Sequence, residues 1–213
     1  MKKIKNFGFL MFPDLEELDL VGPWEIIKIW SELFGEPERC LLISANGENV
    51  RCVKGMHIVA DTNFNDCPPL DVLLIPGGNG RKKAMFDEKL LDFVARQAAD
   101  AEAVISVCTG SFILHAAGLL ADAERVTSNW QVKTEFEEKT RIKIADERFV
   151  RSGKIWTAAG VSAGIDLAFA FVAERAGEET AGRVQFEAEY YPSGKIYEVP
   201  QNLLLPNYAQ KNH

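Results

Sequence analysis

One cysteine stands at a sharp turn between an apolar run and a helical pattern. Residues 103–107 form a short apolar run, long enough for a buried strand, and a helical pattern covers residues 112–117 before Gly118 stops it. Only residues 108–111, Cys-Thr-Gly-Ser, lie between the two. A strand that turns this sharply into a helix holds the turning residue in a strained conformation with its side chain outward, as in a nucleophile elbow. The pattern therefore predicts Cys108 as a nucleophile whose thiolate is favoured by the start of the following helix.

The alternative for Cys108 is a buried structural thiol, since free cysteine is among the most buried residues. The strand–turn–helix context favours the nucleophile, whereas Cys40, Cys52 and Cys67 lack that context and are expected to be structural. The four cysteines show no CxxC spacing. This usage is typical of reduced thiols in an intracellular protein, and we expect a cytoplasmic one.

A glycine-rich loop, Pro-Gly-Gly-Asn-Gly at residues 76–80, follows the strongly apolar segment 70–75. Glycine lets backbone N–H groups approach a ligand closely. The N–H groups of Gly77 and Gly78, together with that of Thr109, are therefore candidates for an oxyanion hole. The alternative is a plain tight turn after a strand. The motif gains weight only from its expected position beside the cysteine.

A nucleophilic thiol needs a group that manages its proton, and histidine is the usual choice in cysteine hydrolases. Of the three histidines, His115 should point away from the sulfur, His57 lies in an expected hairpin, and His213 ends the chain. A carboxylate is therefore favoured by elimination, and four carboxylates lie between residues 14 and 19. Asp19 could point into a cleft as a general acid and base, or cap a helix. The residues alone leave the choice among the four open.

Alternating strands and helices must position these groups. The expected strands cover residues 4–12, 40–44, 70–75 and 103–107, with hairpins at 49–53 and 56–60 and at 147–150 and 155–158. The expected helices begin at Gly22-Pro23 and run to 33, then cover 88–101, 112–117, 130–139, 162–176 with Ser162 as N-cap, and 180–190. This alternation predicts an α/β fold with a mostly parallel central sheet covered on both faces.

In such sheets the ligand sits outside the carboxyl ends of the strands. Three expected loops leave strands at that edge, at residues 14–20, 76–80 and 108–111. The fold should therefore bring a carboxylate, the glycine loop and the thiol together, although they are far apart in the sequence.

Length and composition limit the possible functions. The 213 residues suit a single domain, 1–213, in which residues 191–213 form a tail without a clear pattern. A net charge of −7 excludes the basic surface of a nucleic-acid-binding protein. The apolar run at residues 7–12 is broken by Pro13 and is too short for a signal or a membrane span. No spacing of His, Cys and carboxylates suggests a metal site, so no metal or other cofactor is expected.

Four stretches resemble the ThiJ/PfpI superfamily, and most of all its isonitrile hydratase branch. They are Ser-Val-Cys-Thr-Gly-Ser at 106–111, Ile-Pro-Gly-Gly-Asn-Gly at 75–80, Phe-Pro at 12–13 followed by Leu-Asp-Leu-Val-Gly-Pro at 18–23, and Gly-Val-Ser-Ala-Gly-Ile-Asp at 160–166. The likeness covers nearly the whole chain before the tail. The Cys108 and Gly77-Gly78 motifs mark the superfamily, and the Leu-Asp-Leu-x-Gly-Pro and Cys-Thr-Gly-Ser forms are closer to the branch.

The resemblance implies a flavodoxin-like three-layer sandwich and a homodimer with its active sites near the interface. It implies Cys108 as nucleophile and Asp19 as the carboxylate beside it. The protease form of the superfamily has His directly after the cysteine and does not apply, because Thr109 stands there. The branch commonly has a His before the tryptophan that corresponds to Trp130, and Asn129 stands there instead. A role of that imidazole in substrate binding therefore does not carry over directly.

The implied reaction converts an isocyanide, a small-molecule substrate, to an N-substituted formamide. It passes through a thioimidate on Cys108, with Asp19 acting first as acid and then as base. Asn129, Trp130 and Val161 join the glycine loop as candidate substrate-binding residues, and Trp24 is a further candidate, although aromatic and branched residues near a cleft are more often core. Two alternatives stay open. One is another thiol hydrolase, amidase or glyoxalase-like enzyme on small substrates, and the other is a non-catalytic redox-sensing or ligand-binding protein.

Overall fold

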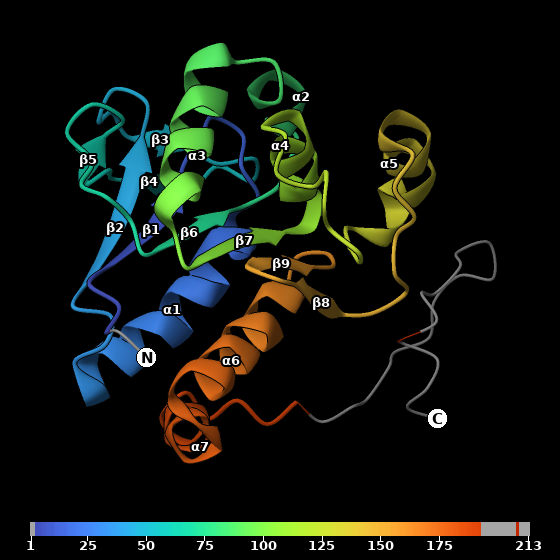
Figure 1. The fold of residues 1–213 in the computed structure, drawn as a ribbon. Helices are drawn as coiled ribbons and strands as arrows, with labels where there is room; N and C mark the ends of the chain where they lie inside the picture. Colours follow the sequence, from blue (N-terminus) through green and yellow to red (C-terminus); the bar gives the residue numbers. More distant parts are fainter. Residues whose placement is uncertain (1–2, 193–207, 209–213) are drawn as a thin grey trace.

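A seven-stranded sheet in the order β5-β2-β1-β6-β7-β9-β8 runs through the centre of the molecule (Figure 1). The computed structural model describes residues 3–192 and Tyr208. The sheet strands are β1 (Asn6–Leu10), β2 (Arg39–Ser44), β5 (Thr62–Asn63), β6 (Val72–Ile75), β7 (Ala103–Val107), β8 (Phe149–Ser152) and β9 (Ile155–Ala158). All neighbouring pairs are parallel except β8 with β9. The predicted mostly parallel α/β sheet is confirmed.

The central strands are buried on both faces because helices cover the sheet from both sides. Every residue of β1, β6 and β7 is buried. In Figure 1, one face carries α1 (Glu17–Phe34), α6 (Ala163–Ala176) and α7 (Glu178–Glu187). The other face carries α2 (Arg81–Ala84), α3 (Glu88–Asp100) and α4 (Ser111–Ala116). The three layers make this a flavodoxin-like sandwich.

Two smaller pieces lie beside these layers. A separate antiparallel hairpin pairs β3 (Val50–Arg51) with β4 (His57–Ile58), as the sequence predicts. A short 3-10 turn, η2 (Trp130–Val132), leads into α5 (Lys133–Thr140). Phe136 is the buried residue of α5 and packs edge-on against Phe112 of α4 at 5.0 Å between ring centroids. This contact anchors an otherwise polar helix to the domain.

The first helix begins earlier than the sequence predicts. The expected start at Gly22-Pro23 is wrong, because α1 begins at Glu17 and contains Pro23. Proline is favoured at a helix start since its missing N–H is unpaired there anyway. Here tertiary packing decides instead. A Cβ on Gly22 would lie 2.8 Å from Ile165 Cγ1 of α6, so the first turns of α1 are pressed against another helix. Asp19 is therefore helical, since α1 begins two residues before it.

The structure differs from the sequence prediction in several smaller features. Strand β5 and helix α2 are absent from the sequence prediction, because each is too short to show periodicity. Ser162 precedes α6 as predicted, but its side chain caps no backbone N–H. Of the expected tail, only Tyr191, Pro192 and Tyr208 lie within the described residues. No helix in the described part of the chain is both long and apolar enough to cross a membrane.

Candidate active site

Cys108 lies at the turn between β7 and α4, in a 3-10 turn over Cys108–Gly110. Its φ is +57°, a left-handed conformation that non-glycine residues rarely adopt. The turn is tight because Gly110 approaches β6 so closely that a Cβ there would lie 2.4 Å from the Ile75 carbonyl oxygen. The predicted strained elbow is therefore present, with the strain on the cysteine itself.

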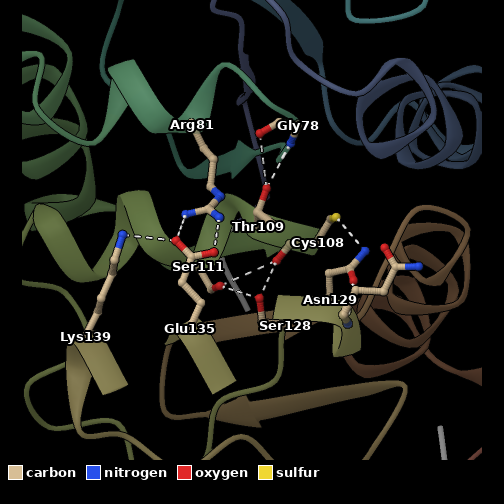
Figure 2. Close-up of polar contacts among 10 residues, drawn as sticks. Gly78, Arg81, Cys108, Thr109, Ser111, Ser128, Asn129, Glu135 and Lys139 are labelled. Atoms are coloured by element: carbon tan, nitrogen blue, oxygen red, sulfur yellow. Dashed lines mark hydrogen bonds and ion pairs between the residues drawn. The ribbon is translucent and has the colours of Figure 1, made fainter. Parts of the chain in front are cut away.

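Polar groups hold the elbow from behind, as Figure 2 shows. The Cys108 carbonyl accepts hydrogen bonds from the hydroxyls of Ser128 at 3.0 Å and Ser111 at 3.4 Å. The Cys108 N–H donates to the Ala159 carbonyl at 2.9 Å. Both backbone groups of the cysteine are thus paired, so the sulfur is presented by a fixed backbone.

Asp19 is completely buried in the first turn of α1 and faces the Cys108 thiol. Its Oδ2 accepts the Gly77 N–H at 2.9 Å, and its Oδ1 has no hydrogen-bond partner. Burial raises the pKa of this carboxyl to about 8, although the hydrogen bonds from Gly77 and Cys108 oppose the rise. Asp19 therefore carries a proton at neutral pH, as a general acid requires.

Burial also raises the pKa of the Cys108 thiol, to about 12, and the negative charge of Asp19 adds to the rise. Three donors oppose it by stabilising the thiolate. They are the Asn129 side-chain amide, whose Nδ2 lies 3.3 Å from Sγ, and the backbone N–H groups of Val161 and Thr109. Since a protonated Asp19 removes the opposing charge, the two groups titrate as a pair that can share one proton.

The backbone N–H groups predicted to form an oxyanion hole have acceptors within the protein. The Gly77 N–H donates to Asp19, and the Gly78 N–H donates to Thr109 Oγ1 at 2.9 Å (Figure 2). The Thr109 N–H acts on the Cys108 sulfur. None of the three is a free donor for a substrate oxyanion, because each already has an acceptor in the protein. They position the acid and stabilise the thiolate instead.

A cavity of about 340 Å³ opens beside the sulfur. It is lined by Glu16, Val53, Gly78, Asn79, Arg81, Lys82, Cys108, Thr109, Asn129, Gln131, Val132, Glu135 and Val161. The expected Asn129 and Val161 are among these residues, whereas Trp130 and Gly77 are not. Trp24 is likewise elsewhere and packs on Phe9 at 5.0 Å between ring centroids. The two residues after Trp130 in the η2 turn, Gln131 and Val132, line the cavity instead.

Val161 combines two properties that the sequence does not reveal. Its φ is +46°, which is unusual for a β-branched residue and costs roughly 1–2 kcal/mol. Its N–H is one of the donors that lower the pKa of the Cys108 thiol. Strained residues of this kind cluster at functional sites. The preceding Gly160 is equally confined, since a Cβ there would lie 2.6 Å from Asn129 Nδ2.

An ion pair in the cavity wall was missed by the sequence reasoning. Arg81 of α2 binds Glu135 of α5 with two hydrogen bonds, at 3.2 and 2.6 Å (Figure 2). The guanidinium is almost fully buried and stacks 3.8 Å from the Phe112 ring centroid. The hydrogen bonds from Arg81 lower the pKa of Glu135 to about 2, helped by a hydrogen bond from Lys139 and by the charges of both cations. No local signal marks this pair, because its partners are far apart in the sequence and meet only in the fold.

Tyr208 lies in the C-terminal tail, for which the sequence predicted no structure. It is partly buried against the hydrophobic core. Burial raises the pKa of its phenol, and the charges of Arg148, Asp146 and Cys108 act on it as well. Tyr208 therefore lies within electrostatic reach of Cys108. The described residues contain no group of three or more His, Cys, Asp or Glu side chains placed to hold a metal ion.

Comparisons with known proteins agree with this geometry. The DJ-1/PfpI family model matches residues 5–174. An isonitrile hydratase of Pseudomonas putida is 39% identical over 88% of this chain and 79% of that protein. The HTH-type transcriptional regulator GbdR of Pseudomonas aeruginosa is 25% identical over 84% of this chain and 49% of the regulator.

Solved structures give the same result for the fold. The crystal structure of a ThiJ/PfpI family protein from Pseudomonas syringae is 32% identical, with a TM-score of 0.81 over 95% of this chain and 79% of that one. Drosophila melanogaster DJ-1beta has a TM-score of 0.73 at 21% identity, over 88% of this chain and 99% of that one. The sequence match and the shared sandwich lead to one conclusion: this chain belongs to the DJ-1/PfpI family.

Proposed function

We propose that the protein is an isonitrile hydratase, which adds water to a small isocyanide and releases an N-substituted formamide. The observation that carries this proposal is the buried contact between Cys108 and the protonated Asp19 carboxyl beside a cavity. The identity of 39% to the Pseudomonas putida isonitrile hydratase supports the same reaction. An addition of water to a carbon atom needs a nucleophile and a proton donor, and this pair supplies both.

In the first step the Cys108 sulfur attacks the terminal carbon of R–N≡C. The shared proton of the pair passes from Asp19 to the same carbon. One S–C bond and one C–H bond form, and the triple bond becomes a C=N double bond. The product is the thioimidate R–N=CH–S–Cys108, and Asp19 is left ionised. Asn129 and the N–H groups of Val161 and Thr109 hold the attacking thiolate in place.

In the second step the ionised Asp19 accepts a proton from water, whose oxygen attacks the thioimidate carbon. Asp19 passes that proton to the nitrogen. As the C–S bond breaks, the remaining hydroxyl proton goes to the sulfur, so the Cys108–Asp19 pair again holds the one proton with which the cycle began. The product is R–NH–CHO, so one isocyanide and one water give one formamide. The carboxyl acts as acid and then as base, which suits a group whose pKa is about 8.

The test is incubation with cyclohexyl, benzyl and para-nitrophenyl isocyanides, with the formamide measured by mass spectrometry. In H₂¹⁸O we expect one heavy oxygen in each product molecule. Cys108→Ala should abolish turnover, and Asp19→Asn should lower it by about 10²-fold to 10⁴-fold because proton transfer is lost. Cys40→Ala is the matched control, since Cys40 does not line the cavity, and it should keep wild-type turnover.

Other outcomes would overturn the proposal. Turnover of methylglyoxal or of small amides, without any formamide from isocyanides, would assign a glyoxalase or an amidase to the same thiol. Selective oxidation of Cys108 by dilute peroxide, with no turnover of any of these substrates, would favour a redox sensor. Near-normal turnover by Asp19→Asn would remove the carboxyl from the mechanism.

A further inference from the structure

Arg148 reaches from the segment before β8 to the loop that carries Val161. Its backbone carbonyl accepts the Ala159 N–H at 2.8 Å. Its Nη2 donates to Ser162 Oγ at 3.0 Å. Arg148 therefore holds residues on both sides of Val161. Ser162 is the residue that would be expected to cap α6, and its hydroxyl accepts from Arg148 instead of capping the helix.

Asp166 fixes the orientation of Arg148. It lies in the first turn of α6, and its Oδ2 accepts from Arg148 Nε. Its Oδ1 accepts a hydrogen bond from the Tyr190 hydroxyl at 2.9 Å. Tyr190 itself stacks on Phe169 of α6, with ring centroids 5.3 Å apart. The guanidinium is thus tied to the helical layer through a carboxylate that is itself held in place.

The loop between these contacts stores backbone strain. Val161 keeps its left-handed φ of +46° only if its neighbours are fixed, because the strain would otherwise relax. Gly160 is fixed against Asn129, and Ser162 is fixed by Arg148. Relaxation at Val161 would turn its N–H away from the Cys108 sulfur. The strained conformation of Val161 therefore depends on the contacts that Arg148 makes with Ser162.

We propose that Arg148 is a positioning residue for the nucleophile, acting on Cys108 through Ser162 and the strained Val161, with Asp166 orienting its guanidinium. This role depends only on the geometry of the loop, and it applies to any substrate that Cys108 attacks. The rival explanation is a direct effect of the Arg148 charge on the sulfur.

The two explanations predict opposite effects of Asp166→Asn on the stability of the Cys108 thiolate. Direct electrostatics requires that Arg148→Met disfavour the thiolate and that Asp166→Asn favour it, since one change removes a positive charge and the other a negative charge. The positioning role requires that both variants disfavour the thiolate. Two other titratable groups interact with Cys108: Asp19 beside it, and Tyr208, which also faces Asp146 and Arg148. Neither is altered in these variants.

The experiment is the rate of Cys108 alkylation by iodoacetamide as a function of pH, followed on the Cys108 peptide by mass spectrometry. This measurement needs no isocyanide, so its result is independent of the proposed function. We expect Arg148→Met, Asp166→Asn and Ser162→Ala each to slow alkylation at neutral pH by about threefold to tenfold, the value of one hydrogen bond. The apparent pKa of the thiol should rise in all three.

Two controls sharpen the result. Arg151→Met removes an arginine of β8 whose hydrogen bonds go to Glu174, at 2.6 Å, and to the Gly153 carbonyl, at 2.9 Å, so the alkylation rate should not change. In a Val161→Gly background the strain is absent, because glycine adopts positive φ freely. Adding Arg148→Met to that background should slow alkylation by less than about twofold, against the threefold to tenfold expected of one hydrogen bond.

Faster alkylation of Asp166→Asn would support the direct charge effect and overturn the positioning role. Wild-type alkylation by Ser162→Ala would overturn it as well, because the link to Val161 passes through that hydroxyl. Ser162→Ala removes a single oxygen atom, so it decides the question even if Arg148→Met does not fold.

Discussion

The Cys108–Asp19 pair shows how burial prepares a thiol and a carboxyl for opposite roles. Removal of water keeps Asp19 protonated near neutral pH, while backbone and amide donors around the sulfur favour the thiolate. A shared proton lets either group be the charged one. The proposed mechanism uses this carboxyl where other cysteine hydrolases use an imidazole.

The raised pKa of Asp19 also predicts how stability depends on pH. The native carboxyl keeps its proton up to about pH 8, whereas the unfolded carboxyl loses it near the ordinary pKa of 3.8. The native state therefore binds more protons between these values. Each pH unit over which the two states differ by one proton changes the free energy of unfolding by about 1.4 kcal/mol. The stabilisation is complete below the unfolded pKa and is lost as pH rises through the folded one.

Asp19→Asn should remove this dependence, because the amide imitates the neutral carboxyl. We expect the variant to be more stable than wild type at about pH 8, with the difference shrinking toward about pH 4. Urea denaturation at a series of pH values measures it. Parallel curves for the two proteins, offset by a constant amount, would contradict the assigned pKa.

At the scale of the elements, the site depends on how closely three strand ends approach one another. The segments after β1, β6 and β7 meet at one edge of the sheet, which is where a parallel α/β sheet binds its ligands. The elbow and the β6 loop come together at Gly110, where the Ile75 and Pro76 carbonyl oxygens leave no room for a side chain. Packing between loops, more than any single strand, sets the distance from the thiol to the acid.

Gly110→Ala should therefore destabilise the fold and disturb the site together. We expect a loss of about 1–3 kcal/mol, the usual cost of overpacking, and slower alkylation of Cys108. Gly182→Ala in α7 is the matched control, since a Cβ there meets nothing within 4 Å. It should be stabilising by about 0.5–1 kcal/mol because alanine favours a helix. Equal urea midpoints for the two variants would show that the close approach does not matter.

Much of this arrangement could be predicted from the sequence, and the failures have a common cause. The elbow at Cys108 and the mostly parallel sheet around it follow from local patterns of apolar residues and glycine. Asp19 could not be separated from its neighbouring carboxylates, because its burial depends on contacts with β6 and β7. The acceptors of the Gly77 and Gly78 N–H groups were missed for the same reason. Both features depend on contacts between residues that are distant in the sequence, and hydrophobic periodicity carries no information about such contacts.

At the scale of the whole molecule, apolar side chains stay exposed near the site. Leu18 follows the buried Glu17, whose side chain accepts hydrogen bonds from the backbone N–H groups of Lys54 and Met56, so both exposed residues, Leu18 and Met56, flank the contact between α1 and the hairpin turn. Their exposed fractions are 38% and 49%. Exposed apolar groups beside a functional site are typical of an interface. We expect this surface to contribute to the homodimer that the family resemblance implies.

Leu18→Glu combined with Met56→Glu should convert the dimer to a monomer, because buried carboxylates would face each other across the interface. Sedimentation velocity measures the change. Phe86→Glu, which replaces a more exposed aromatic residue between α2 and α3, should leave the dimer intact. A wild-type protein that sediments as a monomer would remove the basis for this prediction.

The Arg81–Glu135 pair forms one part of the cavity wall, and its charges do not change between mildly acidic and mildly alkaline pH. Its carboxylate stays ionised down to about pH 2, and a guanidinium is never deprotonated in a protein. An uncharged ligand thus meets the same local field in mildly acidic and mildly alkaline buffer. A bell or step in a pH–rate profile with a neutral isocyanide would then have its origin elsewhere than in this part of the wall.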